Sequence, residues 1–154
     1  MLRISQWKGN DYDARNAETP SELAAWLEPL ADAGVDIFDT STRRSWLPEF
    51  PDSSLNLAGW AKKVTGKLAM TVGSVGLEAP FDPHLFAAQS PTAVSLTNLS
   101  KLVDMIEREE FDLVGAGRVL LANPNWPKLI REGAFDELAT YDAARTAEMI
   151  EPAV

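Results

Sequence analysis

Glycine and arginine near Phe111 are the residues whose types and spacing point most directly to chemistry. A short apolar run with β-favouring residues ends in Gly115, Gly117 and Arg118, which is the pattern of a buried parallel strand that leads into a ligand-binding turn. Glycine leaves backbone N–H groups open to an approaching anion, and the planar donor fork of arginine suits a phosphate group. The alternative is an ordinary strand-to-helix turn with a solvated arginine, because short glycine motifs often occur without a ligand.

A second glycine-containing turn, Gly73-Ser74, follows the predicted strand Leu68–Val72. Backbone N–H groups in such a turn form a concave nest for an anion, and the serine hydroxyl adds a donor. Because the carboxyl ends of neighbouring parallel strands share one edge of a sheet, we expect this turn and Gly117-Arg118 to form a two-loop phosphate site. Each turn alone is weak evidence for that site.

Two adjacent arginines, Arg43 and Arg44, lie just beyond another predicted strand, Val35–Asp39. Ligands of barrel enzymes bind in such loops at the carboxyl ends of the strands. The alternative is that both arginines pair with acidic neighbours such as Glu49 and Asp52. The residues themselves favour that second interpretation.

The elements that position these turns alternate between strands and helices. Strands are predicted at residues 1–5, 35–39 and 68–72 and in the run that begins at Phe111. Helices are predicted from a capping box at Thr19 with Pro20 at the first helical position, from Ser54 to Gly66, from Asn98 with the apolar stripe Leu99, Leu102, Val103 and Ile106, and from Asn125 to Gly133. Pro29 is expected to kink or shorten the first helix. This alternation over short loops indicates a parallel sheet with crossover helices in a single domain, residues 1–154.

Two stretches carry weaker patterns. Residues 78–97 form a proline-containing connection with a short helical turn predicted from Pro83 to Ala88, and His84 within it is expected to be solvated. The tail from residue 134 is predicted to be partly helical, with Phe135 and Leu138 docking against the core.

Composition limits the classes of partner. The net charge of −9 over 154 residues argues against nucleic acid and against an anionic membrane surface. The chain contains no cysteine, and the single histidine has no neighbouring ligands, so we expect neither disulfides nor a metal site. No apolar run reaches the roughly 18 residues of a spanning helix and no signal peptide is evident, so a cytoplasmic location is expected.

Three stretches resemble the Old Yellow Enzyme family, the FMN-dependent NAD(P)H:flavin oxidoreductases and ene-reductases. DLVGAGRVLLANP, from Asp112, is similar to the last barrel strand and its turn, and LAMTVGSVGL, from Leu68, is similar to the seventh strand. LRISQWK, from Leu2, is similar to the fifth strand. A full eight-unit barrel needs about 250 residues, so the resemblance implies the C-terminal half of a TIM barrel, with four consecutive β-α units.

The resemblance also implies a cofactor, a reductant and site residues. In such a barrel Gly73, Ser74, Gly117 and Arg118 would hold the FMN phosphate, and Arg3 would reach the flavin ring. NAD(P)H would be the reductant and an activated alkene the substrate. The proton donor and the substrate-anchoring pair of the family belong to strands that this sequence lacks, so no catalytic residue is assigned.

Three functions remain open at this point: an ene-reductase-type flavin oxidoreductase that is incomplete as an isolated chain, a phosphate-binding barrel enzyme without flavin, and a non-catalytic half-barrel assembly module. A four-strand piece of a barrel leaves two unpaired edges. We therefore expect a homo-oligomer or a complementing half-barrel as partner.

Overall fold

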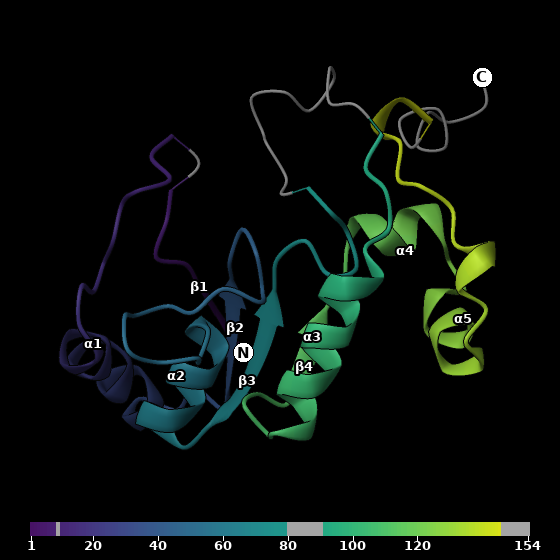
Figure 1. Ribbon diagram of the computed structural model, residues 1–154. Coiled ribbons are helices and arrows are strands. Elements are labelled where there is room, and N and C mark those ends of the chain that lie inside the picture. Colours follow the sequence, from purple (N-terminus) through teal and green to yellow (C-terminus); the bar gives the residue numbers. More distant parts are fainter. Residues whose placement is uncertain (9, 80–90, 146–154) are drawn as a thin grey trace, which may run out of the picture.

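The computed structural model describes residues 1–8, 10–79 and 91–145. Its centre is a parallel sheet of four strands in the order β1-β2-β3-β4, which is also their order along the chain. The strands are β1 (Leu2–Ile4), β2 (Ile37–Ser41), β3 (Leu68–Val72) and β4 (Leu113–Gly115). Helices separate consecutive strands (Figure 1). The predicted partial barrel of four β-α units is confirmed.

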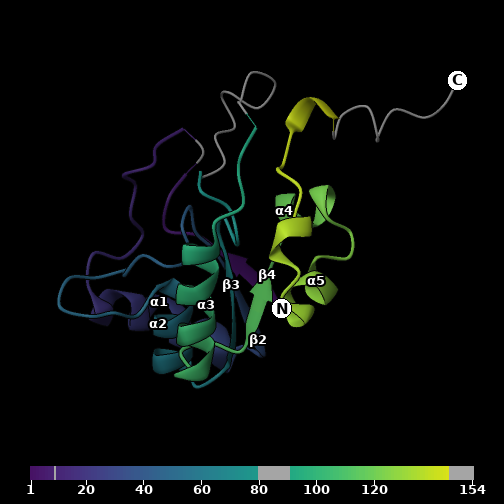
Figure 2. The ribbon, with the colours of Figure 1, turned by 45° about the vertical axis from the view of Figure 1, so that its right-hand side comes forward.

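The helices are α1 (Pro20–Asp32), α2 (Leu57–Thr65), α3 (Leu96–Glu107), α4 (Arg118–Ala122) and α5 (Trp126–Glu132), followed by a 3-10 turn, η2 (Phe135–Glu137). The helices α1, α2 and α3 cover one face of the sheet (Figure 2). No helix among the described residues is long and apolar enough to cross a membrane.

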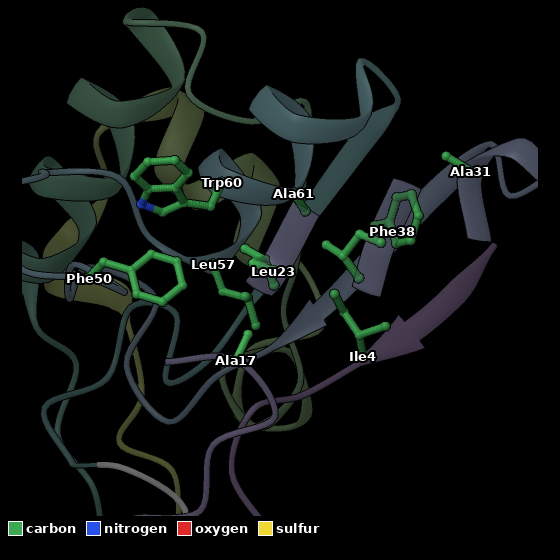
Figure 3. Packing of buried hydrophobic residues seen from close by; sticks show 10 residues of the cluster. Ile4, Ala17, Leu23, Ala31, Phe38, Phe50, Leu57, Trp60 and Ala61 are labelled. Atoms are coloured by element: carbon green, nitrogen blue, oxygen red, sulfur yellow. The ribbon is translucent and has the colours of Figure 1, made fainter. Parts of the chain in front are cut away.

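The helix-covered face of the sheet forms the main core. Phe38 of β2 is fully buried and packs with Ile4 of β1 and with Leu23 and Leu27 of α1 (Figure 3). Alternate residues of the strands point the other way, because successive side chains in a strand alternate between faces. Leu113 of β4 points to that opposite face and is 41% exposed. The face without helices is therefore open at β4.

The start of α1 has the predicted cap at Thr19, but the Glu22 carboxylate accepts the N–H of Glu18, at 2.7 Å, in place of the Thr19 N–H that a full capping box requires. The side-chain oxygen of Thr19 accepts the N–H of Glu22 at 3.2 Å, and Pro20 stands at the first helical position. Pro29 does not shorten the last turn, since α1 continues to Asp32, and a kink at Pro29 stays a prediction. Pro29 and Ala25, whose carbonyl loses its helical hydrogen bond, both lie on the exposed side, where solvent can replace that bond.

Two helix caps differ from the prediction. Asn56, not Ser54, caps α2, because its buried side chain accepts the Gly59 N–H at 2.9 Å and also donates to the Ser45 carbonyl. Ser95, not Asn98, caps α3. The strand β3 has the predicted bounds, and Gly66 and Gly133 end their helices as expected.

Strand β2 starts two residues later than predicted. Gly34 and Val35 lie just beyond α1 and still donate their N–H groups to Ala31 and Leu30 of that helix, so they form the turn that closes it. The strand therefore begins at Ile37 and continues to Ser41.

The buried stripe of α3 is narrower than predicted. Leu99 and Leu102 are buried as expected, and Met105 joins them, but Val103 and Ile106 are 41% and 42% exposed. Leu102 and Met105, three residues apart, pack against Ala69 and Phe111 of the core. Val103 and Ile106 each follow one of these buried residues and face away from the core.

The tail also differs from the prediction. Phe135 lies in η2 and is 42% exposed, so it does not dock, whereas Leu138 is half-buried. The turn predicted from Pro83 to Ala88, with His84, lies outside the described residues, as do residues 146–154.

Candidate functional site

The two glycine-containing turns meet at the carboxyl ends of β3 and β4. Val72 and Gly115 are register partners in these adjacent parallel strands, so the turns that follow them start side by side. Arg118 Nη2 donates a hydrogen bond to Ser74 Oγ at 3.1 Å. The structure thus brings together the loops that sequence reasoning paired, and their role in binding stays a prediction.

Ser74 connects three segments through one hydroxyl group. Its Oγ donates to the carbonyl oxygen of Arg43 at 2.8 Å and accepts the bond from Arg118. Its backbone has φ of 48°, a left-handed conformation that is uncommon for a residue other than glycine. Strain of this kind persists where surrounding contacts enforce it and is common at binding sites.

The glycines of the two turns have different structural reasons. A Cβ on Gly73 would lie 2.5 Å from Thr42 Oγ1, and a Cβ on Gly115 would lie 2.5 Å from Val72 Cγ2. Packing therefore explains both of these glycines. A Cβ on Gly117 would meet no atom within 4 Å, so packing does not explain Gly117, and its backbone is open to an approaching group.

Arg118 is held in place by three groups. Besides Ser74, its Nη2 donates to the Ala79 carbonyl at 3.2 Å, and its guanidinium lies 5.8 Å from the centre of the Tyr141 ring. Burial lowers the pKa of Arg118, and the nearby Tyr141 raises it. An arginine keeps its charge at neutral pH despite such a shift, so a half-buried cation faces this turn.

Two adjoining cavities lie at this end of the sheet. One, of about 230 Å³, is lined by Trp7, Ser41, Thr42, Arg43, Val72, Gly73, Ser74, Val75, Leu77, Gly115, Gly117 and Arg118. The second, of about 260 Å³, lies between the loop after β1 and the loop after β2, and shares Trp7, Ser41, Thr42 and Arg43 with the first. We call them the phosphate cavity and the side cavity.

The charge of the two cavities contrasts with that of the whole protein. Among the described residues, their walls include four arginines, Arg15, Arg43, Arg44 and Arg118, and a single carboxylate, Glu49. That carboxylate forms an ion pair with Arg15 and accepts a hydrogen bond from Gln6. A cationic hollow in a protein of net charge −9 concentrates small anions.

Burial raises the pKa of Glu49, although the Arg15 charge and the Gln6 hydrogen bond act in the opposite direction. Glu49 therefore tends towards its neutral form as the pH falls, earlier than an exposed glutamate does. Loss of this negative charge makes the side cavity more cationic.

The loop after β2 does not form the acidic pairs suggested as an alternative from the sequence. Glu49 pairs with Arg15 instead, and the Arg43 guanidinium lies 3.7 Å from the centre of the Tyr12 ring. Tyr12 and Trp7 were missed as wall residues. The polar loop that contains Tyr12 has no sequence pattern that would reveal its contact with Arg43.

Arg3 lies apart from the two turns. Its Nε and Nη2 both contact Asp39 Oδ2 at 2.8 Å, and its side chain is 62% exposed. It does not line either cavity, so its contact with a flavin ring stays a prediction. Among the described residues no cluster of three potential metal ligands occurs.

Comparisons with known proteins show a likeness of fold. No protein-family model matches the sequence, and no curated protein matches it closely enough to be a relative. A solved morphinone reductase in complex with tetrahydroNAD superposes with a TM-score of 0.58 at 13% identity, over 94% of this chain. A second structure titled morphinone reductase gives 0.51 at 12% identity, over 91% of this chain. The chain spans 31% and 30% of these two proteins.

Proposed function

We propose that the chain is the phosphate-binding part of an FMN-dependent NAD(P)H:flavin oxidoreductase of the ene-reductase type. The observation that carries the proposal is the convergence of Ser74 and Arg118 beside the uncovered backbone of Gly117. The sequence resemblance at three stretches and the likeness of fold to a reductase bound to tetrahydroNAD support it.

The residues present fit the phosphate end of FMN. The Ser74 hydroxyl and the Arg118 guanidinium are donors for phosphate oxygens, and the open face of Gly117 permits close approach to the backbone. The side cavity gives further room beyond the phosphate cavity. When bound, FMN supplies hydride chemistry between a nicotinamide and an activated alkene. The role of this chain's residues is to hold and orient the cofactor.

The chain spans under a third of its structural neighbours, so catalysis requires groups from elsewhere. Near-attack geometry needs the reacting atoms about 3–3.5 Å apart, and no described residue is assigned as proton donor. We expect the isolated chain to bind FMN weakly and to reduce enones no faster than free FMN.

A flavin titration tests the cofactor site. Arg118→Ala removes a charge-assisted contact, which contributes about 1.5–3 kcal/mol, so we expect FMN affinity to fall about 10- to 100-fold. Quenching of FMN fluorescence measures the dissociation constant. The control is Arg131→Ala, which removes an exposed arginine of α5 and should leave affinity unchanged. Equal affinity of Arg118→Ala and the parent chain would refute the assignment.

Steady-state oxidation of NADPH with an enone and added FMN tests activity. We expect the rate of free FMN in the same buffer, since no described residue is assigned as proton donor. A turnover number of about 1 per second or more lies in the ordinary enzyme range and would show that the chain is a complete enzyme.

A phosphate-binding barrel enzyme without flavin is the second candidate. The observation that favours it is the size of the phosphate cavity, about 230 Å³. Pockets for whole small-molecule ligands are about 300–1,000 Å³, so this cavity by itself fits a ligand smaller than FMN. Under this alternative, purified protein is colourless and binds phosphate monoesters that contain no flavin as tightly as FMN.

A further inference from the structure

Arg43 stands where the phosphate cavity and the side cavity meet, and the proposed set of phosphate ligands does not include it. Its guanidinium stacks on Tyr12 at 3.7 Å from the ring centre. Its Nε is buried and has no hydrogen-bond partner within residues 1–8, 10–79 and 91–145. Neither Glu49 nor Asp52 forms an ion pair with it, and Glu49 is engaged by Arg15.

A buried guanidinium donor without an acceptor is unfavourable, because it has lost water and gained no other partner. Stacking on an aromatic ring offsets part of that loss and fixes the plane of the guanidinium, which leaves its in-plane donors available. This arrangement prepares Arg43 for an anionic acceptor that enters the cavity.

A backbone carbonyl group links Arg43 to the Gly73-Ser74 turn. Its carbonyl oxygen accepts the hydrogen bond from Ser74 Oγ, and that same Oγ accepts the bond from Arg118. Both arginines line the phosphate cavity. One short chain of hydrogen bonds thus sets the positions of two cationic residues around one hollow.

We propose that Arg43 is a second cationic ligand of the phosphate site, and that two guanidinium groups select a doubly charged phosphate monoester over a singly charged diester. The inference rests on the proposed phosphate site and extends it to a residue and a ligand charge. Two arginines match the charge of a dianion, whereas a diester leaves one of them without its counter-charge.

Arg44 provides a matched control. It is adjacent in sequence, it is exposed, and it lines the side cavity but not the phosphate cavity. Arg43→Gln and Arg44→Gln remove the same net charge from adjacent positions, so a loss of affinity that depends on net charge alone is equal in both. A difference between them reports the position of the charge.

The test is isothermal titration of the full chain with orthophosphate and with dimethyl phosphate at pH 8 and low salt. We expect the parent to prefer orthophosphate at least tenfold, and Arg43→Gln to lose about tenfold in orthophosphate affinity with a smaller loss for dimethyl phosphate. Arg44→Gln, which removes a charge of the side cavity only, should lower orthophosphate affinity clearly less than Arg43→Gln does. Arg43→Lys, which keeps the charge without the planar fork, should fall between the parent and Arg43→Gln, and it serves as the test variant if Arg43→Gln does not fold.

The outcomes separate this inference from the proposed function. If Arg118→Ala weakens orthophosphate and FMN binding and the Arg43 variants do not, Arg43 is not a ligand and the proposed function stands. If the Arg43 variants weaken orthophosphate binding and FMN does not bind, the inference stands and the flavin function fails. Equal losses for Arg43→Gln and Arg44→Gln would show a general charge effect and overturn the inference.

Discussion

The two turns of the site allow opposite predictions for the same substitution, glycine to alanine, at Gly73 and at Gly117. A methyl group on Gly73 would overlap Thr42, whose carbonyl oxygen belongs to the backbone and cannot swing away. A methyl group on Gly117 would enter open space at the wall of the phosphate cavity. Gly73→Ala should therefore affect stability, and Gly117→Ala should affect binding.

The expected magnitudes follow from these contacts. Forced overpacking costs about 1–3 kcal/mol, and we expect Gly73→Ala near the upper end because backbone must shift. Alanine in place of Gly117 gains about 0.4–1 kcal/mol by restricting the unfolded chain. Its free energy of unfolding should change by less than about 1 kcal/mol, while its FMN affinity falls about tenfold, or about 1.4 kcal/mol.

Urea denaturation followed by circular dichroism measures the unfolding free energy, and FMN fluorescence quenching measures affinity. The reasoning is refuted if Gly117→Ala binds FMN as the parent chain does, since the open backbone would then have no part in binding. It is equally refuted if Gly73→Ala is as stable as the parent, because the overlap with Thr42 is the sole structural reason given for that glycine.

The remaining predictions concern the base of the sheet and its open face. Burial alone would raise the pKa of Asp112, but hydrogen bonds from Lys62 and from the Ala69 N–H outweigh burial, and the pKa is lowered. The ionised carboxylate therefore stabilises the fold at pH values above the ordinary pKa of 3.8. Asp112→Asn should lower the unfolding free energy by about 1 kcal/mol at pH 7. This difference should disappear as the pH falls through the lowered pKa of the folded state. An equal loss of unfolding free energy at pH 2 and at pH 7, measured by urea titration, would contradict this. We propose that a second copy or a complementing half-barrel covers the open face, so Leu113→Glu should reduce self-association in light scattering, and a parent chain that is monomeric at all concentrations would argue against a homo-oligomer.

Much of the fold follows from local signals in the sequence. Thr19 and Glu22 are three residues apart, so their capping contact forms within one turn of helix. The apolar run Leu68–Val72 makes a strand with the predicted bounds. The turns at Gly73 and Gly117 were also recognisable, because a glycine within two residues of the end of a predicted strand is a local pattern.

Local sequence signals could not decide which of two nearby residues caps a helix. Ser54 and Asn56 are both acceptable cap residues, and what decides is that the Asn56 amide also bonds Ser45 and Thr71, eleven and fifteen residues away. Ser95 and Asn98 pose the same ambiguity. The exposure of Val103 likewise depends on where α3 meets its neighbours, since the pattern of apolar residues along a helix does not say how wide its contact is.

The sequence by itself determined that this protein is a row of β-α units with two glycine turns at the same end of the sheet, because strand direction and turn chemistry are encoded by adjacent residues. Only the tertiary structure decided what each of those residues contacts. It assigned Gly73 to packing and left Gly117 open, and it placed Arg43 on Tyr12, 31 positions earlier in the chain. Such roles depend on the approach of distant segments, and that approach is settled by the packing of the whole chain.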